Sequence, residues 1–178
     1  MNNGFIIGIT GISGSGKTLL SKELIKNIEI DKLIHVDDYW KDHKSIPKSI
    51  SKWREWERPM NINFDKLFKD LIKLKKKRYT ILSEGFYLFY KKEIRNIIDF
   101  KIYIDLPNNL MIKRRIDKFS SENNQEFYCK EIVIKEYRRY GLPTRKYADL
   151  ILNGTKKIKI NSRKILKRLF KIKQPNLN

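Results

Sequence analysis

Short apolar runs alternate with helically spaced apolar residues along the whole chain. Five runs rich in β-branched and aromatic residues are typical of buried strands, at 5–10, 33–36, 79–83, 100–104 and 150–152. Between these runs, the spacing of apolar residues predicts helices over 19–28, 63–74, 108–119 and 125–140, and a last helix over about 161–173. Strands that alternate with helices predict an α/β fold, in which a five-stranded, mostly parallel sheet carries helices on both faces.

The predicted strands end at residues that can carry chemistry. A glycine-rich loop over 11–18 follows the first strand, Asp37 follows the second, and Glu84 follows the third. In a mostly parallel sheet, ligands bind beyond the carboxyl ends of the strands. We therefore expect the loop and both carboxylates to line one cleft.

Length and cysteine content narrow the class of protein. A chain of 178 residues suits one domain, spanning 1–178. Cys129 is the only cysteine, which excludes an internal disulfide and fits a reducing compartment. The sequence has no secretory signal pattern and no apolar run near the length of about 18 residues that a transmembrane helix needs. These features predict a cytoplasmic protein without a membrane partner, and they leave the oligomeric state open.

The formal net charge of +20 raises the question of a nucleic-acid partner. Basic residues are densest over 73–78 and 156–173, and the second stretch contains no acid. From Ser162 onward its apolar positions fit a helical stripe packed on the body of the protein: Ile165, Leu166, Leu169 and Phe170. This pattern favours a solvated basic face over nucleic-acid or membrane-surface binding, although binding stays an alternative.

Residues 11–18 read Gly-Ile-Ser-Gly-Ser-Gly-Lys-Thr, which is a complete phosphate-loop motif between a predicted strand and a predicted helix. Glycines allow successive backbone N–H groups to turn toward phosphate oxygens, and the helix N-terminus favours an anion. The motif predicts a bound nucleotide, ATP or GTP, together with Mg²⁺. The residues expected to hold the nucleotide are Gly11, Ser13, Gly14, Ser15, Gly16, Lys17 and Thr18. Lys17 supplies charge at the β- and γ-phosphates, and the Thr18 hydroxyl is a Mg²⁺ ligand.

Phosphoryl transfer also needs an activated acceptor and further charge neutralisation. Asp37 is a candidate base for an attacking hydroxyl, and Glu84 is a candidate Mg²⁺ ligand. For Asp38, a helix-capping role is an equal alternative. Arg114 and Arg115 lie on the helix after the fourth strand, where a guanidinium can stabilise the transferred group. Because the two arginines are adjacent, one of them must point elsewhere, and the sequence does not say which.

An ordered set of motifs resembles the uridine kinase family, which includes the nicotinamide riboside kinases. The resemblance covers residues 4–154 and rests on the phosphate loop and five further segments: Val36-Asp37-Asp38-Tyr39-Trp40, Trp56-Glu57-Arg58-Pro59, Ser83-Glu84-Gly85-Phe86-Tyr87-Leu88-Phe89-Tyr90, Ile102-Tyr103-Ile104-Asp105 before Arg114-Arg115, and Leu142-Pro143-Thr144-Arg145-Lys146-Tyr147-Ala148-Asp149. It implies a P-loop kinase fold with a helical lid, here at about 108–128.

The resemblance also implies an activity, the transfer of the γ-phosphoryl group of ATP or GTP to the 5′-hydroxyl of a small ribosyl compound or other alcohol. Asp37 matches the family's base, and Glu57 stands where the family has an aspartate that holds the ribose hydroxyls. Arg114 and Arg115 match the start of the lid. The family's lid carries a further arginine a little later, and in this chain that cation is either missing or replaced by Lys118. Asn153 falls where the family's chain passes near the adenine.

One departure concerns the acceptor. Uridine kinases carry a base-reading hairpin before the third strand, and this chain has no room for it. Aromatic residues stand near the candidate base and can either stack on a heterocycle or simply pack: Tyr39, Trp40, Trp53 and Trp56. The predicted substrate-binding residues are Asp37, Tyr39, Trp56, Glu57 and Arg115. Uridine or cytidine leads as acceptor, with nicotinamide riboside or another alcohol as alternatives. A nucleotide hydrolase or switch is disfavoured because the chain lacks an Asn-Lys-x-Asp motif.

Overall fold

The computed structural model describes residues 4–41, 54–118 and 125–173. Five strands form one sheet in the order β2-β3-β1-β4-β5, and every neighbouring pair is parallel. Their bounds are β1 Phe5–Gly11, β2 Lys32–His35, β3 Thr80–Gly85, β4 Phe100–Asp105 and β5 Leu150–Asn153. All five lie within two residues of the ranges predicted from the sequence, so the expected α/β fold with a five-stranded sheet is confirmed.

The α-helices are α1 Lys17–Ile25, α3 Phe64–Lys76, α4 Lys92–Ile97, α5 Asn108–Lys118, α6 Gln125–Tyr128, α7 Ile134–Glu136 and α8 Ile158–Lys173. Two π-helical segments, Cys129–Val133 and Tyr137–Gly141, join α6 and α7 into one helical run over 125–141. The 3-10 turns are Val36–Tyr39, Pro59–Asn61 and Leu142–Tyr147. The sequence did not predict α4, and α8 begins before the expected start at about 161.

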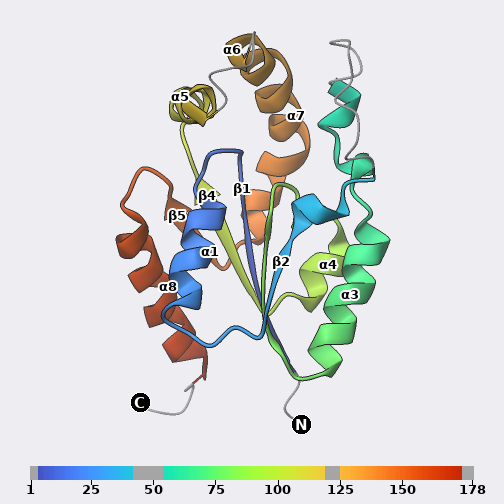
Figure 1. Ribbon diagram of the computed structural model, residues 1–178, viewed down its shortest axis with the longest axis vertical. Coiled ribbons are helices and arrows are strands. Elements are labelled where there is room, and N and C mark those ends of the chain that lie inside the picture. The colour runs from blue at the N-terminus through green and yellow to red at the C-terminus, as the bar shows by residue number, and fades with distance from the viewer. Residues whose placement is uncertain (1–3, 42–53, 119–124, 174–178) are drawn as a thin grey trace.

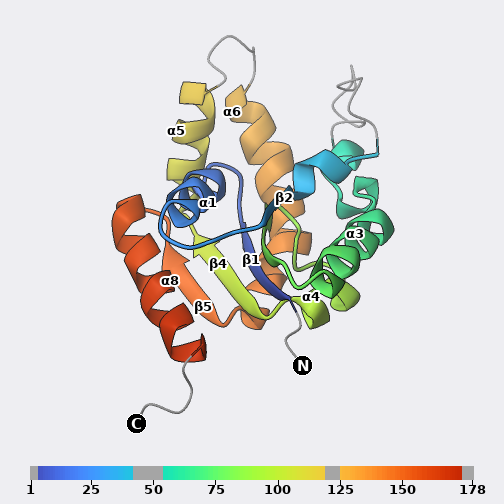
Figure 2. The ribbon, with the colours of Figure 1, turned by 60° about the horizontal axis from the view of Figure 1, so that its bottom comes forward.

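Helices cover both faces of the sheet, as predicted (Figures 1 and 2). On one face, α1 and α8 pack together, and their residues Leu20, Leu24, Ile165 and Leu169 join a cluster with the buried side chains of the strands. On the other face, α3, α4 and the run over 125–141 build a second, larger cluster. The sheet is therefore buried on both sides, which is why its strands read as continuous apolar runs.

The basic C-terminal helix corrects one expectation. Ile165 and Leu169 are buried, as the predicted stripe requires, but the Phe170 side chain is 64% exposed. Successive helix residues point about 100° apart, and the Phe170 side chain projects away from the face that buries Ile165 and Leu169. The basic residues Lys164, Lys167 and Arg168 are exposed on the outer side. Among the described residues, no helix has the length and apolar character to cross a membrane.

The carboxyl ends of β1, β3 and β2 lie side by side in the sheet. Glu84 of β3 is in register with Ile9 of β1 on one side and with His35 of β2 on the other. Gly85 follows, and a Cβ atom there would lie 2.2 Å from the Cβ of Val36, so only glycine allows this close approach. The chain leaving β2 thus turns directly over the end of β3 and carries Asp37 to the phosphate loop.

Candidate active site

The phosphate loop is built from backbone groups. Gly14 and Gly16 have positive φ angles of 71° and 95°, in the left-handed region that favours glycine. Gly16 caps α1 without any side-chain hydrogen bond, and the first turn of α1 has no acidic residue. The hydroxyl of Ser15 is buried without a hydrogen-bond partner among the described residues. A helix N-terminus with open N–H groups and a buried unpaired hydroxyl fits the phosphates of a nucleotide.

Lys17 lies inside this loop. Its Nζ donates hydrogen bonds to the carbonyl oxygens of Gly11, at 3.0 Å, and Ile12, at 3.2 Å. Burial lowers the pKa of Lys17, while the carboxylates of Glu84 and Asp37 act in the opposite direction. The loop therefore holds the ammonium group at its centre, with two acids nearby that favour its charged form.

The two residues predicted to bind Mg²⁺ are in contact. Thr18 Oγ1 donates a hydrogen bond of 2.8 Å to Glu84 Oε1, and His35 Nδ1 lies 2.8 Å from the same oxygen. The described part of the chain contains no group of three or more acidic, histidine or cysteine side chains that could hold a metal alone. Mg²⁺ usually takes one or two carboxylates and completes its shell with phosphate oxygens and water, so Thr18 and Glu84 stay the predicted ligands. The sequence did not indicate His35 as a neighbour of Glu84, because that contact depends on the pairing of β2 with β3.

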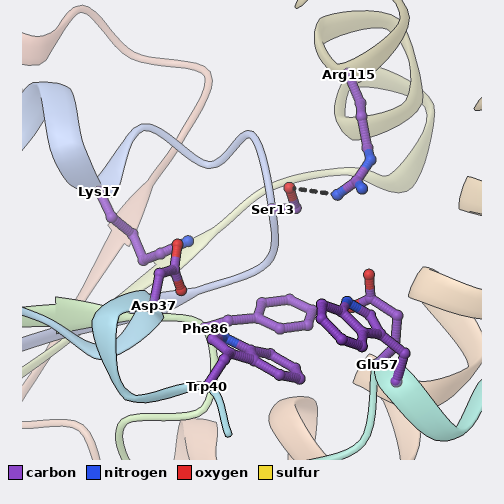
Figure 3. A pocket seen from close by; sticks show the side chains of 8 residues that line it. Ser13, Lys17, Asp37, Trp40, Glu57, Phe86 and Arg115 are labelled. Atoms are coloured by element: carbon purple, nitrogen blue, oxygen red, sulfur yellow. Dashed lines mark hydrogen bonds between the residues drawn. The ribbon is translucent and has the colours of Figure 1, made fainter. Parts of the chain in front are cut away.

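One pocket of about 210 Å³ is lined by several of the predicted site residues (Figure 3). Its lining residues come from the phosphate loop, the turn after β2, the chain before Pro59, the end of β3 and helix α5: Ser13, Lys17, Asp37, Trp40, Trp56, Glu57, Phe86 and Arg115. In Figure 3, Lys17 and Asp37 point into the same part of the cavity. The cleft expected at the strand ends is present in part. Asp37 lines it beside the phosphate loop, whereas Glu84, which was also expected there, is buried and is not among the lining residues.

Glu57 is a buried acid at the wall of this pocket, with 8% of its surface exposed. Tyr128 of α6 donates its hydroxyl hydrogen to Glu57 Oε1. Burial raises the pKa of Glu57, and the Tyr128 hydrogen bond and the Arg115 charge oppose that rise. Sequence reasoning missed Tyr128, since its partner is far away in the chain and position 128 showed only helical periodicity.

The aromatic candidates divide into two groups. Trp40 and Trp56 line the pocket and stack with ring centroids 5.8 Å apart and an interplanar angle of 16°. Tyr39 corrects the prediction of a substrate-binding residue, because it is buried in the core and its hydroxyl donates to Asp70 Oδ2 of α3 at 2.9 Å. Asp70 and the core packing turn Tyr39 away from the cavity. Trp53 lies outside the described residues.

The adjacent arginines take different directions. Arg115 lines the pocket and donates from Nη1 to Ser13 Oγ at 3.0 Å. Arg114 donates to the carbonyl oxygens of Gly14, at 2.9 Å, and Gly154, at 3.0 Å. Arg115 therefore faces the pocket, and Arg114 ties the phosphate loop to the chain that leaves β5.

Asn153 lies at the end of β5, in a second cavity of about 460 Å³ that includes Leu106, Pro107 and Thr155. Its Oδ1 accepts a hydrogen bond of 2.8 Å from the backbone N–H of Thr155. Arg114 connects this chain segment to the phosphate loop through Gly154. Through Arg114, the chain segment beside this second cavity is therefore tied to the phosphate loop, and the predicted contact of Asn153 with a nucleotide base stays a prediction.

The two arginines provide a prediction. Arg115→Ala should lower kcat by about tenfold to a hundredfold, because it removes a charged hydrogen-bond donor worth about 1.5–3 kcal/mol from the pocket. Arg114→Ala should instead raise KM for ATP and leave kcat within about threefold, since Arg114 donates to the backbone carbonyl oxygens of Gly14 and Gly154 and does not line the pocket. Initial rates for both variants check this expectation. A larger loss of kcat in Arg114→Ala than in Arg115→Ala would contradict the assignment.

Comparisons with known proteins agree with this geometry. The family model described as "Phosphoribulokinase / Uridine kinase family" matches residues 75–161. A uridine kinase of Staphylococcus aureus (strain JH9) is 29% identical, over 88% of this chain and 91% of the relative. Among solved structures, shikimate kinase from Acinetobacter baumannii in complex with shikimate superposes with a TM-score of 0.61 and 18% identity, over 99% of this chain and 97% of that chain. A possible uridine kinase from Bacillus stearothermophilus gives a TM-score of 0.54 and 20% identity, over 85% and 90%.

The fold and the phosphate loop define a P-loop kinase fold. Within that class, the resemblance to the uridine kinase family that the sequence motifs indicated is confirmed by the family model and by the curated relatives. The similarity supports a phosphotransferase.

Proposed function

We propose that the protein is a kinase that transfers the γ-phosphoryl group of ATP to the 5′-hydroxyl of a nucleoside, with uridine or cytidine as the leading acceptor. The observation that carries the proposal is the single pocket shared by Lys17, Asp37 and Glu57. It joins a phosphate-binding cation, a candidate base and a buried carboxylate that can accept hydrogen bonds from sugar hydroxyls. The similarity to uridine kinases supports the same activity.

In this proposal, Asp37 takes the proton from the acceptor hydroxyl. The acceptor oxygen then forms a bond to the γ-phosphorus, and the bond from that phosphorus to the β–γ bridging oxygen breaks, which releases ADP. Lys17 and Arg115 stabilise the charge on the transferred group. Thr18 and Glu84 would hold Mg²⁺, which supplies charge neutralisation at the phosphates when it is bound.

The walls of the pocket favour a ribosyl compound with a flat base. Glu57 can accept hydrogen bonds from two neighbouring hydroxyls, and the stacked rings of Trp40 and Trp56 offer a flat surface beside it. Between the end of α3 at Lys76 and the start of β3 at Thr80, the chain has no space for a base-reading hairpin. In place of that hairpin, Trp40 and Trp56 would contact the base. Because the usual base-reading element is absent, nicotinamide riboside or another small alcohol is the alternative acceptor.

The direct test measures ADP formation with ATP or GTP and Mg²⁺ in the presence of single acceptors. The panel contains uridine, cytidine, nicotinamide riboside, adenosine and shikimate. We expect turnover to depend on the acceptor and to be greatest with a pyrimidine riboside. Equal nucleotide hydrolysis with and without every acceptor would overturn the proposal in favour of a nucleotide hydrolase.

Glu57 gives a prediction about the sugar. 2′-Deoxyuridine should have kcat/KM at least about tenfold below that of uridine, because a buried carboxylate loses a hydrogen-bond donor when the hydroxyl is missing. Glu57→Gln should reduce that discrimination to less than about threefold, since its amide binds the hydroxyl less strongly than a carboxylate does. Steady-state kinetics with both nucleosides check this. Unchanged discrimination in Glu57→Gln would remove Glu57 from the sugar site.

A further inference from the structure

Tyr128 does not line the pocket, but it contacts two residues that do, Glu57 and Arg115. Its hydroxyl donates to Glu57 Oε1, and Glu57 Oε2 accepts no hydrogen bond from any described residue. Glu57 is buried and lines the cavity. The tyrosine therefore fixes one carboxylate oxygen and leaves the other for a ligand.

The ring of Tyr128 supports a second contact. The guanidinium carbon of Arg115 lies 5.1 Å from the centre of this ring, a distance at which the positive charge is attracted to the aromatic face. Arg115 also donates to Ser13 Oγ of the phosphate loop at 3.0 Å. Ser13, Arg115, Tyr128 and Glu57 thus form one connected series of side chains from the phosphate loop to the acid of the acceptor site.

These four side chains come from four separate parts of the chain, and Tyr128 is the one that contacts both Arg115 and Glu57 among the contacts between described residues. Arg115 stands on α5 and Tyr128 on α6, which are in contact, while Glu57 belongs to the chain before Pro59. A ligand that orders Glu57 therefore also orders Tyr128 and, through its ring, Arg115. Such ordering at one site reduces the cost of ordering at the other.

We propose that Tyr128 is a positioning residue that couples acceptor binding to nucleotide binding at the phosphate loop. This inference rests on the proposed kinase function. The hydroxyl of Tyr128 holds Glu57 toward the acceptor, and its ring holds Arg115 toward Ser13. Because such coupling is reciprocal, the acceptor raises the affinity for the nucleotide by the same factor as the nucleotide raises the affinity for the acceptor.

The test is calorimetric binding of uridine, or of the best acceptor in the panel, with and without saturating Mg·ADP. For the unmodified protein we expect Mg·ADP to tighten acceptor binding about fivefold to fiftyfold. Tyr128→Phe keeps the ring but loses the hydroxyl. It should weaken the acceptor about tenfold in the absence of nucleotide, leave Mg·ADP binding alone unchanged, and reduce the coupling to less than about twofold.

Two further variants separate positioning from general stability. Tyr128→Leu also removes the support of Arg115, so it should additionally lower kcat by about tenfold. Tyr79→Phe is the matched control, since Tyr79 precedes β3 at the opposite end of the sheet, and it should retain the full coupling. Full coupling in Tyr128→Phe would overturn the inference. So would an equal weakening of the acceptor and of Mg·ADP when each binds alone, because that result indicates a purely structural role.

The inference and the proposed function fail in different ways. A panel without acceptor-dependent turnover overturns the kinase proposal and the coupling with it. Turnover of an acceptor with coupling intact in Tyr128→Phe overturns the coupling alone. Unfolding in urea of Glu57→Gln, Tyr128→Phe and the double variant tests the contact itself, for which we expect a coupling of about tenfold in the unfolding equilibrium constant.

Discussion

Asp37→Asn should lower kcat by about 10²–10⁴ while the protein still binds ATP. Asparagine has nearly the shape of aspartate but cannot accept the proton of an attacking hydroxyl. Asp37 lines the same pocket as Lys17 and Glu57, beside the phosphate loop, which is why we propose it as the base. Steady-state rates with the best acceptor, together with calorimetric binding of Mg·ADP, separate the loss of chemistry from a loss of nucleotide binding.

Asp38→Asn is the matched control. It changes the same charge one residue later in the same 3-10 turn. Both aspartates are exposed, but Asp37 lines the pocket and Asp38 does not. We expect its kcat to stay within about threefold of the unmodified protein, since surface changes away from a site have small effects. A near-normal rate for Asp37→Asn would remove Asp37 as the base. A loss in Asp38→Asn as large as in Asp37→Asn would show that charge near the turn, rather than one carboxylate, controls the rate.

The sequence predicted the sheet well for a physical reason. Strands buried on both faces must be continuously apolar, so runs such as 100–104 are recognisable without any knowledge of their neighbours. Short elements lack such a pattern. Helix α4 has six residues and only Ile94 buried, which is too little periodicity to detect. The spacing of apolar residues predicts Phe170 on the buried face next to Leu169, but spacing alone does not show how wide the buried face of the helix is.

The candidate site was predictable where it depends on strand ends and not where it depends on contacts across the fold. The loop over 11–18, Asp37 and Glu84 follow strands, and a parallel sheet brings such ends together. By contrast, Tyr128 contacts Glu57 across 71 positions of sequence, and nothing local marks either residue for the other. The choice between Arg114 and Arg115 also depended on where α5 lies against the phosphate loop.

Lys17→Ala should lower kcat by about 10²–10³ and weaken ATP binding, because it removes a charged donor aimed at the phosphates. The Nζ group donates to the Gly11 and Ile12 carbonyl oxygens, so its loss also leaves two loop carbonyls without their partner. Initial rates across ATP concentrations, with binding of Mg·ADP, measure both effects. Unimpaired turnover would contradict the assignment of the phosphate loop itself.

The net charge of +20 makes a control for long-range attraction necessary. Lys22→Ala removes the same charge from the exposed side of α1, so it tests whether the overall field or the local ammonium matters. We expect Lys22→Ala to keep kcat and KM within about twofold, since one charge in so large an excess changes the field little. Lys17→Arg completes the comparison. It restores the charge, but a planar guanidinium cannot take the place of a compact ammonium between two carbonyls, so we expect less than about tenfold recovery. Full recovery by arginine would mean that the loop needs only a positive charge near the phosphates, without the geometry that Lys17 provides.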